Sequence, residues 1–166
     1  MKKIALCGVL PALALAISLL EGWVALMLIV PIPGIKLGLA NIVTVFALAR
    51  MSPKEAVAIL LCRVTLGAVF AGSITSFLFS LLGGMLSLCV MFLLMQRKKW
   101  FSIFGVCIAG AAAHNIGQIV AAIFVMQSVS VINYLPVLLI AAIPLGMLSG
   151  VISRMVLQHL SKIYIS

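Results

Sequence analysis

Acidic residues are nearly absent from this sequence: aspartate does not occur, and glutamate occurs only at positions 21 and 55. Binding of magnesium together with a diphosphate requires a cluster of carboxylates, so the composition argues against such catalysis by this chain alone. The phosphate-binding loop of ATP-driven enzymes is also missing. The cysteines lie inside apolar runs without the spacing of metal ligands, and we interpret them as buried small hydrophobic residues. They are Cys7, Cys62, Cys89 and Cys107. We therefore expect no metal and no cofactor.

Charge of either sign is scarce, since only 8% of the residues are charged and 66% are hydrophobic. Ordinary soluble domains are about half apolar and a quarter charged, so this chain must meet lipid rather than water. No polar stretch is long enough to form a second, soluble unit. The sequence predicts one transmembrane domain over residues 1–166.

The apolar runs predict an all-α integral membrane protein, a bundle of about six transmembrane helices. We expect the crossings near residues 4–20, 37–50, 55–75, 77–95, 101–125 and 135–158. The first run resembles a signal sequence, but no suitable cleavage context follows it, so we expect an uncleaved helix. The stretch 21–36 is broken by Pro31, Pro33 and Gly34, which predicts an apolar outer loop after the first helix. Ser52 and Pro53 have the residue types of an N-cap and a first helical position.

The basic residues support this count and exclude a nucleic-acid partner. The net charge is +9, but the cations stand in short clusters between apolar runs, as in the cytoplasmic loops of membrane proteins. We expect the chain to span the cell (cytoplasmic) membrane with both termini in the cytoplasm, and nine of the eleven basic residues then fall on the inner side. They are Lys2, Lys3, Arg50, Lys54, Arg97, Lys98, Lys99, Arg154 and Lys162.

A few polar residues are predicted at membrane depth, where they are costly and tend to be functional. His114, Asn115 and Gln118 fall at i, i+1 and i+4, within one face of the fifth helix, after four small residues. We predict that they form one wall of an outward-facing substrate pocket; the alternative is that they hold helices together. The full candidate set for binding substrate is Glu21, Lys36, Asn41, Arg63, His114, Asn115 and Gln118.

Other interpretations of these residues stay open. Arg63 lies inside the third helix with no obvious carboxylate partner, so it either extends toward the inner surface or binds a carbonyl or a ligand anion. The set leans cationic, which favours an anionic or zwitterionic small molecule. An intramembrane enzyme with His114 and Glu21 as acid and base is a third possibility, but an isolated histidine among alanines is more often a helix contact. We expect no catalytic residue.

Two pairs of small residues have the four-residue spacing that lets helices approach closely. One is Ala12 and Ala16 in the first helix, and the other is Gly146 and Gly150 in the sixth. Each pair either packs within the bundle or forms a docking face for a partner protein.

Two long motifs resemble a bacterial family. The stretch from Pro31 to Asn41 (PIPGIKLGLAN), Arg63, and the stretch from Gly110 to Gln118 (GAAAHNIGQ) resemble the Gx transporter family, which is also labelled heptaprenyl diphosphate synthase component I. The resemblance extends over nearly the whole chain. The helix plan, the apolar outer loop and the Ala12/Ala16 pair are also similar to the substrate-binding S components of energy-coupling factor vitamin transporters.

The resemblance implies two different functions. As an S-component-like subunit, the chain would bind a small molecule near the outer surface and dock through Ala12 and Ala16 on a transmembrane coupling subunit with ATPases. As component I, it would be a non-catalytic membrane accessory to a heptaprenyl diphosphate synthase, in the biosynthesis of the menaquinone side chain. The sequence analysis favours the transporter and keeps the accessory subunit as the alternative.

Overall fold

The computed structural model describes residues 2–27, 39–97 and 100–164. Within these ranges there are six α-helices, one short 3₁₀ helix and no strand. The elements are α1 (Lys2–Met27), α2 (Asn41–Arg50), α3 (Pro53–Ala71), α4 (Ile74–Gln96), α5 (Ile103–Met126), η1 (Val129–Tyr134) and α6 (Leu135–Tyr164). The all-α membrane fold expected from the sequence is confirmed.

Short polar caps separate the long apolar helices. Ser52 accepts a hydrogen bond from the backbone N–H of Glu55, and the Glu55 carboxylate accepts one from the backbone N–H of Ser52 at 2.6 Å. This reciprocal capping box, with Pro53 in the first turn, confirms the predicted start of α3. α3 ends at Gly72, whose φ of 58° lies in the left-handed region that glycine adopts without strain.

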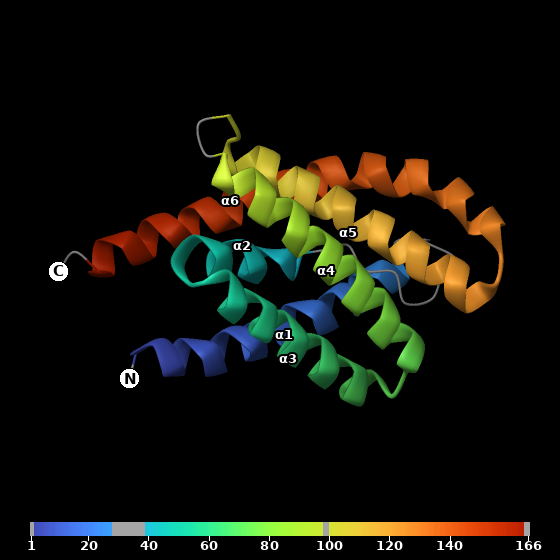
Figure 1. Ribbon diagram of the computed structural model, residues 1–166, viewed down its shortest axis with the longest axis horizontal. Helices are drawn as coiled ribbons and strands as arrows, with labels where there is room; N and C mark the ends of the chain where they lie inside the picture. Colours follow the sequence, from blue (N-terminus) through green and yellow to red (C-terminus); the bar gives the residue numbers. More distant parts are fainter. Residues whose placement is uncertain (1, 28–38, 98–99, 165–166) are drawn as a thin grey trace.

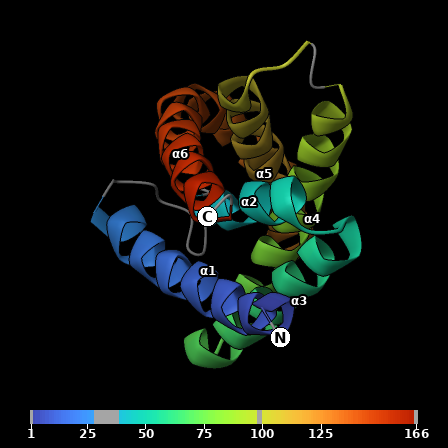
Figure 2. The same ribbon diagram turned by 90° about the vertical axis from the view of Figure 1, so that its left-hand side faces the viewer.

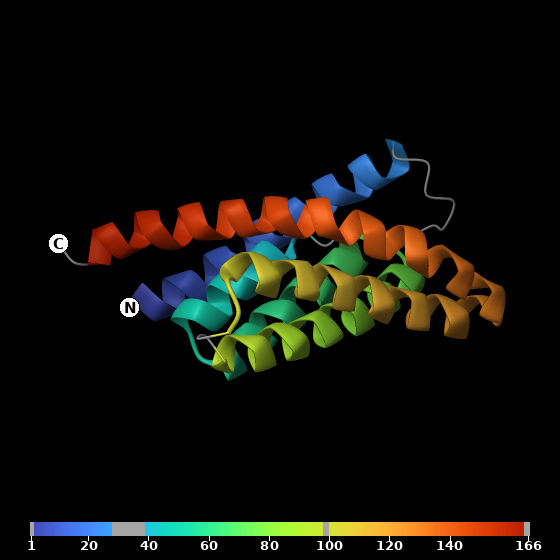
Figure 3. The same cartoon turned by 90° about the horizontal axis from the view of Figure 1, so that it is seen from above.

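The helices surround a short central one. α2 contacts each of the other five α-helices, and Asn41–Ala47 are all buried. α4, α5 and α6 pack as consecutive antiparallel neighbours, whereas α1 contacts only α2 and α3 among the described elements. Figure 1 and Figure 3 show this arrangement, with α1 at the edge of the bundle. The core is therefore built around α2, and α1 is peripheral.

Two boundaries differ from the prediction. Helix α1 does not end at residue 20 but continues through Glu21 and Gly22 to Met27, because the helix-breaking prolines come only at 31 and 33. Helix α2 begins at Asn41, after a turn at residues 39 and 40, rather than at residue 37. The greater part of the predicted outer loop, residues 28–36, lies outside the described residues.

The helices differ in how much of a bilayer each can span. Three described stretches are long and apolar enough to cross alone: 74–96, 103–126 and 129–159. α2 has ten residues and is about 15 Å long, roughly half the thickness of the hydrocarbon core. It is enclosed by the other helices rather than exposed to lipid along its length.

The ends of the helices sort into two sides. The start of α1, the end of α6, the α2–α3 turn and the α4–α5 connection all lie toward one end of the molecule, and the α3–α4 turn and η1 lie toward the other (Figures 1 and 3). The exposed Arg50, Arg97 and Arg154 belong to segments at the first end. These three arginines thus belong to segments that lie toward the same end of the molecule, and that this end faces the cytoplasm stays a prediction.

Candidate functional site

Five of the seven predicted substrate-binding residues are buried in the interior of the bundle. Asn41, Arg63, His114, Asn115 and Gln118 each expose 5% or less of their surface. They come from α2, α3 and α5. The side chains of Glu21 and Lys36 lie outside the described residues, so the structure gives no account of them.

Two adjacent glycines on α4, Gly83 and Gly84, leave room for the side chains of two of these residues. A Cβ atom added to Gly83 would lie 3.0 Å from the imidazole Nδ1 of His114, and one added to Gly84 would lie 3.2 Å from the Nη2 atom of Arg63. Larger side chains at 83 and 84 would occupy the space of the imidazole and the guanidinium. His114 from α5 and Arg63 from α3 therefore meet α4 at adjacent positions.

Helices α4 and α5 make an even closer contact one turn further along α5, at Gly117. A Cβ atom on Gly117 would lie 2.6 Å from the backbone oxygen of Leu82 and 2.7 Å from the Cα atom of Gly83. These neighbours are backbone atoms, which cannot rotate away. The glycines of the GAAAHNIGQ motif thus set the α4–α5 distance, which determines the position of His114.

Asn115 points to a different neighbour from His114. Its amide nitrogen donates a 2.7 Å hydrogen bond to the backbone oxygen of Leu138 on α6. Adjacent helical residues are about 100° apart, and here His114 contacts α4 whereas Asn115 contacts α6. That the two residues share one wall of a substrate pocket stays a prediction. The Asn115 amide nitrogen holds two helices together, as the packing alternative required.

Asn41 is the most conspicuous unpartnered group in the described part of the chain. It is the first residue of α2, 4% exposed, and neither atom of its amide has a hydrogen-bond partner there. The hydroxyl of Ser87 on α4 and the amide oxygen of Asn115 are in the same state. Buried polar groups are normally hydrogen-bonded, so these atoms mark places where water or a polar ligand can bind.

The serines of α4 are not among the residues predicted from the sequence. Ser80 and Ser87 are buried, and they flank the glycine pair at 83 and 84. The hydroxyl of Ser87 would lie 3.3 Å from a Cβ atom on Gly110. Spacings of three to four residues place these small and polar residues on one face of α4, and this periodicity is visible in the sequence.

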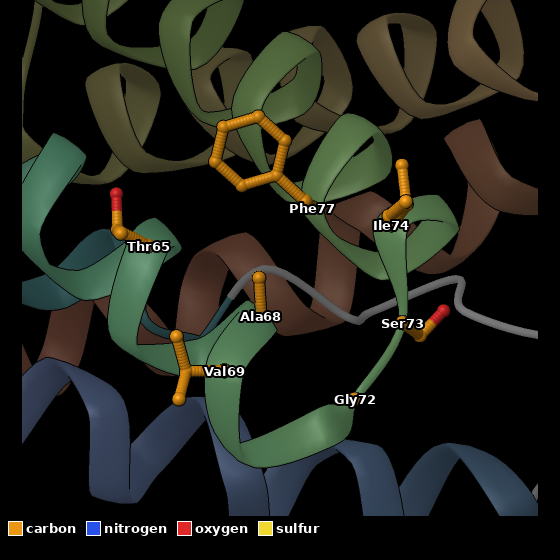
Figure 4. Close-up of a pocket in the computed structure, with 7 residues that line it drawn as sticks. All are labelled: Thr65, Ala68, Val69, Gly72, Ser73, Ile74 and Phe77. Carbon is orange, nitrogen blue, oxygen red and sulfur yellow. The ribbon is translucent and has the colours of Figure 1, made fainter.

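Among the hollows lined by described residues are three that include none of the five buried candidates. One, of about 300 Å³, lies at the α3–α4 turn, where Thr65, Ser73 and Phe77 surround it (Figure 4). Another, of about 220 Å³, is lined by apolar residues of α2, α4, α5 and α6 and by Phe101. The largest, of about 430 Å³, lies between α1, α2 and α6 and is apolar throughout. The role of the buried polar residues in binding substrate stays a prediction.

The small-residue pairs have separate positions. Gly146 packs directly on the backbone of α5, where an added Cβ would lie 2.5 Å from the Cα atom of Ile108, and Gly150 meets Phe104 in the same way. This pair therefore packs within the bundle. Ala12 and Ala16 are exposed on the outer face of α1, and their predicted docking role is untested by the described contacts.

The fold and this interior define a class: a small polytopic membrane protein in which a glycine pair on α4 leaves room for the buried side chains of His114 and Arg63. Comparison with protein families matches residues 10–156 to the family described as heptaprenyl diphosphate synthase component I. The chain belongs to this family. Comparisons with curated proteins and with solved structures give no match.

Proposed function

We propose that this chain is the membrane accessory subunit, component I, of a heptaprenyl diphosphate synthase that makes the side chain of menaquinone. The observation that carries the proposal is the family match, which covers almost the whole bundle. The sequence analysis ranked this function second, and the comparison favours it over the transporter. A component I implies a partner subunit that supplies the rest of the enzyme.

The chemistry of the chain supports a non-catalytic role. Prenyl transfer from a diphosphate requires carboxylates that hold metal ions, and the sequence has only two glutamates. One of them, Glu55, caps the start of α3. The catalytic carboxylates must then belong to the partner, and this chain supplies a place in the membrane where the growing apolar product can be held.

The distribution of charge supports an orientation for this complex. We place the end of the bundle that carries Arg50, Arg97 and Arg154 in the cytoplasm, because basic residues collect on that side of the membrane. Both termini are then cytoplasmic, in the cell membrane. A soluble catalytic partner and its anionic substrates would meet the protein at this basic surface.

Reconstitution of the two subunits tests the proposal. The chain in lipid nanodiscs is mixed with the candidate catalytic subunit, and formation of long-chain prenyl diphosphate is measured. We expect the rate to rise at least about tenfold over empty nanodiscs, which corresponds to an activation free energy lower by about 1.4 kcal/mol. Equal rates with loaded and empty nanodiscs, and no binding between the subunits, would contradict it.

A second candidate function, the S-component-like uptake subunit, is favoured by two observations of its own. Ala12 and Ala16 are exposed on a peripheral helix, where a coupling subunit with ATPases has access to them. The buried amide of Asn41 has no hydrogen-bond partner among the described residues. Mass spectrometry of the detergent-extracted protein would test this candidate. A water-soluble small molecule that copurifies and is displaced in the variant Asn41→Leu would support transport over the accessory role.

A further inference from the structure

Of the three hollows described above, the largest is an apolar groove, and none of the five buried candidate residues lines it. It lies between α1 and α6, which do not contact each other in the described part of the chain, and α2 contacts both. Figure 2 shows α1 and α6 standing apart, with α2 inside the bundle. The walls of the groove include two residues from each of α1, α2 and α6: Leu13, Ile17, Ile42, Phe46, Leu148 and Ile152.

The groove has the size and composition of a site for an apolar chain. Its volume of about 430 Å³ lies within the range of small-ligand sites, about 300–1,000 Å³. It follows α6 from Leu148 to Val156, a rise of about 12 Å. The rim residues Leu13, Leu148 and Ile152 are exposed, so an apolar chain in the bilayer can enter from the side.

One end of the groove is cationic. Along α2, the groove face runs through Ile42 and Phe46, and the next residue on that face is Arg50, the last residue of the helix. Arg50 is exposed and donates a 3.2 Å hydrogen bond from Nη2 to the backbone oxygen of Leu157 on α6. This bond fixes the guanidinium across the α2–α6 side of the groove mouth. A guanidinium has five N–H donors, so others stay available for an anion.

The same end carries further positive charge. Lys54 is exposed in the first turn of α3, just beyond the α2–α3 turn, and α1 begins at this end with Lys2 and Lys3 in its sequence. The groove thus combines an apolar track at membrane depth with cations where the track reaches the polar surface. A ligand that fits both parts has one apolar chain and a strongly anionic headgroup.

We propose that the α1–α2–α6 groove binds the isoprenoid chain of a polyprenyl diphosphate, with the diphosphate at Arg50. This inference rests on the proposed function and names the ligand through which component I would act. Charge-assisted hydrogen bonds from a guanidinium favour a diphosphate over a neutral alcohol. The groove walls exclude water from the first isoprene units, and the rest of a long chain continues into the bilayer.

Photocrosslinking tests the proposal without using synthase activity. The full chain in nanodiscs is exposed to a geranylgeranyl diphosphate analogue with a diazirine on its second isoprene unit, which the proposal places inside the groove, and crosslinked peptides are identified by mass spectrometry. We expect crosslinks on α1 and α6 at the groove walls. Unlabelled geranylgeranyl diphosphate should compete at least about tenfold better than geranylgeraniol or phosphatidylglycerol.

Five variants, one of them a matched control, locate the site. Leu148→Trp and Leu13→Trp fill the groove from opposite walls and should each weaken probe binding about tenfold or more. Val151→Trp is the matched control, because Val151 is 45% exposed on α6 and does not line the groove. Arg50→Gln should remove the preference for diphosphate over alcohol, and Arg50→Lys should retain part of it. Thermal unfolding of every variant confirms that it is folded.

The possible outcomes test the groove proposal separately from the proposed function. Equal loss in the groove and control variants, equal competition by phosphatidylglycerol, or crosslinks between two copies of the chain would overturn the groove proposal. If the probe fails to bind while the chain still activates a synthase, the groove proposal fails and the proposed function stands. If the probe binds as described but no synthase is activated, the proposed function fails and the site remains.

Discussion

At the scale of single residues, the glycines of α4 and α5 determine where the polar side chains lie. Gly83 and Gly84 leave room for the imidazole of His114 and the guanidinium of Arg63, and Gly117 lets the two backbones touch. Each of these three glycines has a different neighbour, so the loss of stability on substitution should differ among them. The GAAAHNIGQ motif therefore has a packing function whatever its polar members bind.

The variant Gly117→Ala tests this packing. Its new methyl group would lie 2.6 Å from a backbone oxygen, so we expect α4 and α5 to separate and the protein to lose about 1–3 kcal/mol of stability. Gly105→Ala on the same helix is the matched control, because the nearest atom to its Cβ is the hydroxyl of Ser102 at 3.7 Å. Thermal unfolding in detergent measures both. Equal melting temperatures for the two variants would show that the close contact is not formed.

Asn115 provides a second residue-scale prediction. The variant Asn115→Ala removes a buried 2.7 Å hydrogen bond between α5 and α6, so we expect a loss of about 0.6–1.7 kcal/mol of stability. Asn133→Ala in η1, where the side chain is exposed, should leave the melting temperature unchanged. A binding role for the amide oxygen would add a loss of ligand affinity to this loss of stability. Affinity lost with unchanged stability would contradict the packing role.

At the scale of helices, α1 and α2 have opposite surroundings. α2 is short, central and buried along Asn41–Ala47, whereas α1 is long and contacts only two neighbours. Both helices are apolar, because apolar side chains are favourable both against lipid and in the protein interior. The uncovered side of α1 is available to lipid or a partner, while α2 positions Asn41 and Arg50 at its two ends.

The exposed face of α1 yields a prediction about this element. Ala12 and Ala16 are exposed, whereas Ala14 exposes only 1% of its surface. We therefore expect the double variant Ala12→Leu/Ala16→Leu to keep its melting temperature. Ala14→Leu should lower the free energy of unfolding by about 1–3 kcal/mol through overpacking, and the melting temperature should fall with it. If α1 docks on a partner, the double variant should also fail to copurify with that partner. A marked loss of stability in the double variant would place this face inside the bundle.

At the scale of the whole molecule, the positions of the turns predict which sites can be labelled from each side of the membrane. Single cysteines are introduced into a cysteine-free chain at Ser130, in the exposed η1, and at Arg97, at the end of α4. A membrane-impermeant thiol reagent should label the Ser130 position in intact cells and the Arg97 position only after permeabilisation. Labelling of both positions from outside would reject the orientation with both termini in the cytoplasm.

The sequence by itself determined the class of protein, the helices and the family. Apolar runs, proline positions and the Ser52-Pro53 signal act through local rules, namely helix length, helix breaking and capping, which do not depend on the rest of the chain. The motifs from Pro31 to Asn41 and from Gly110 to Gln118 pointed to the family that the comparison shows. The continuation of α1 to Met27 was not predicted, because an apolar stretch of sequence is compatible with both a surface loop and a helix.

Only the tertiary structure decided which polar residues meet. Periodicity places His114 and Asn115 side by side on α5, but the packing of α4 and α6 on either side sends one to Gly83 and the other to Leu138. In the same way, Gly146 and Gly150 face α5 while Ala12 and Ala16 stay exposed, although both pairs have the same spacing. Contacts between helices depend on their relative positions, and in a bundle where every helix is apolar the hydrophobic pattern does not fix these positions.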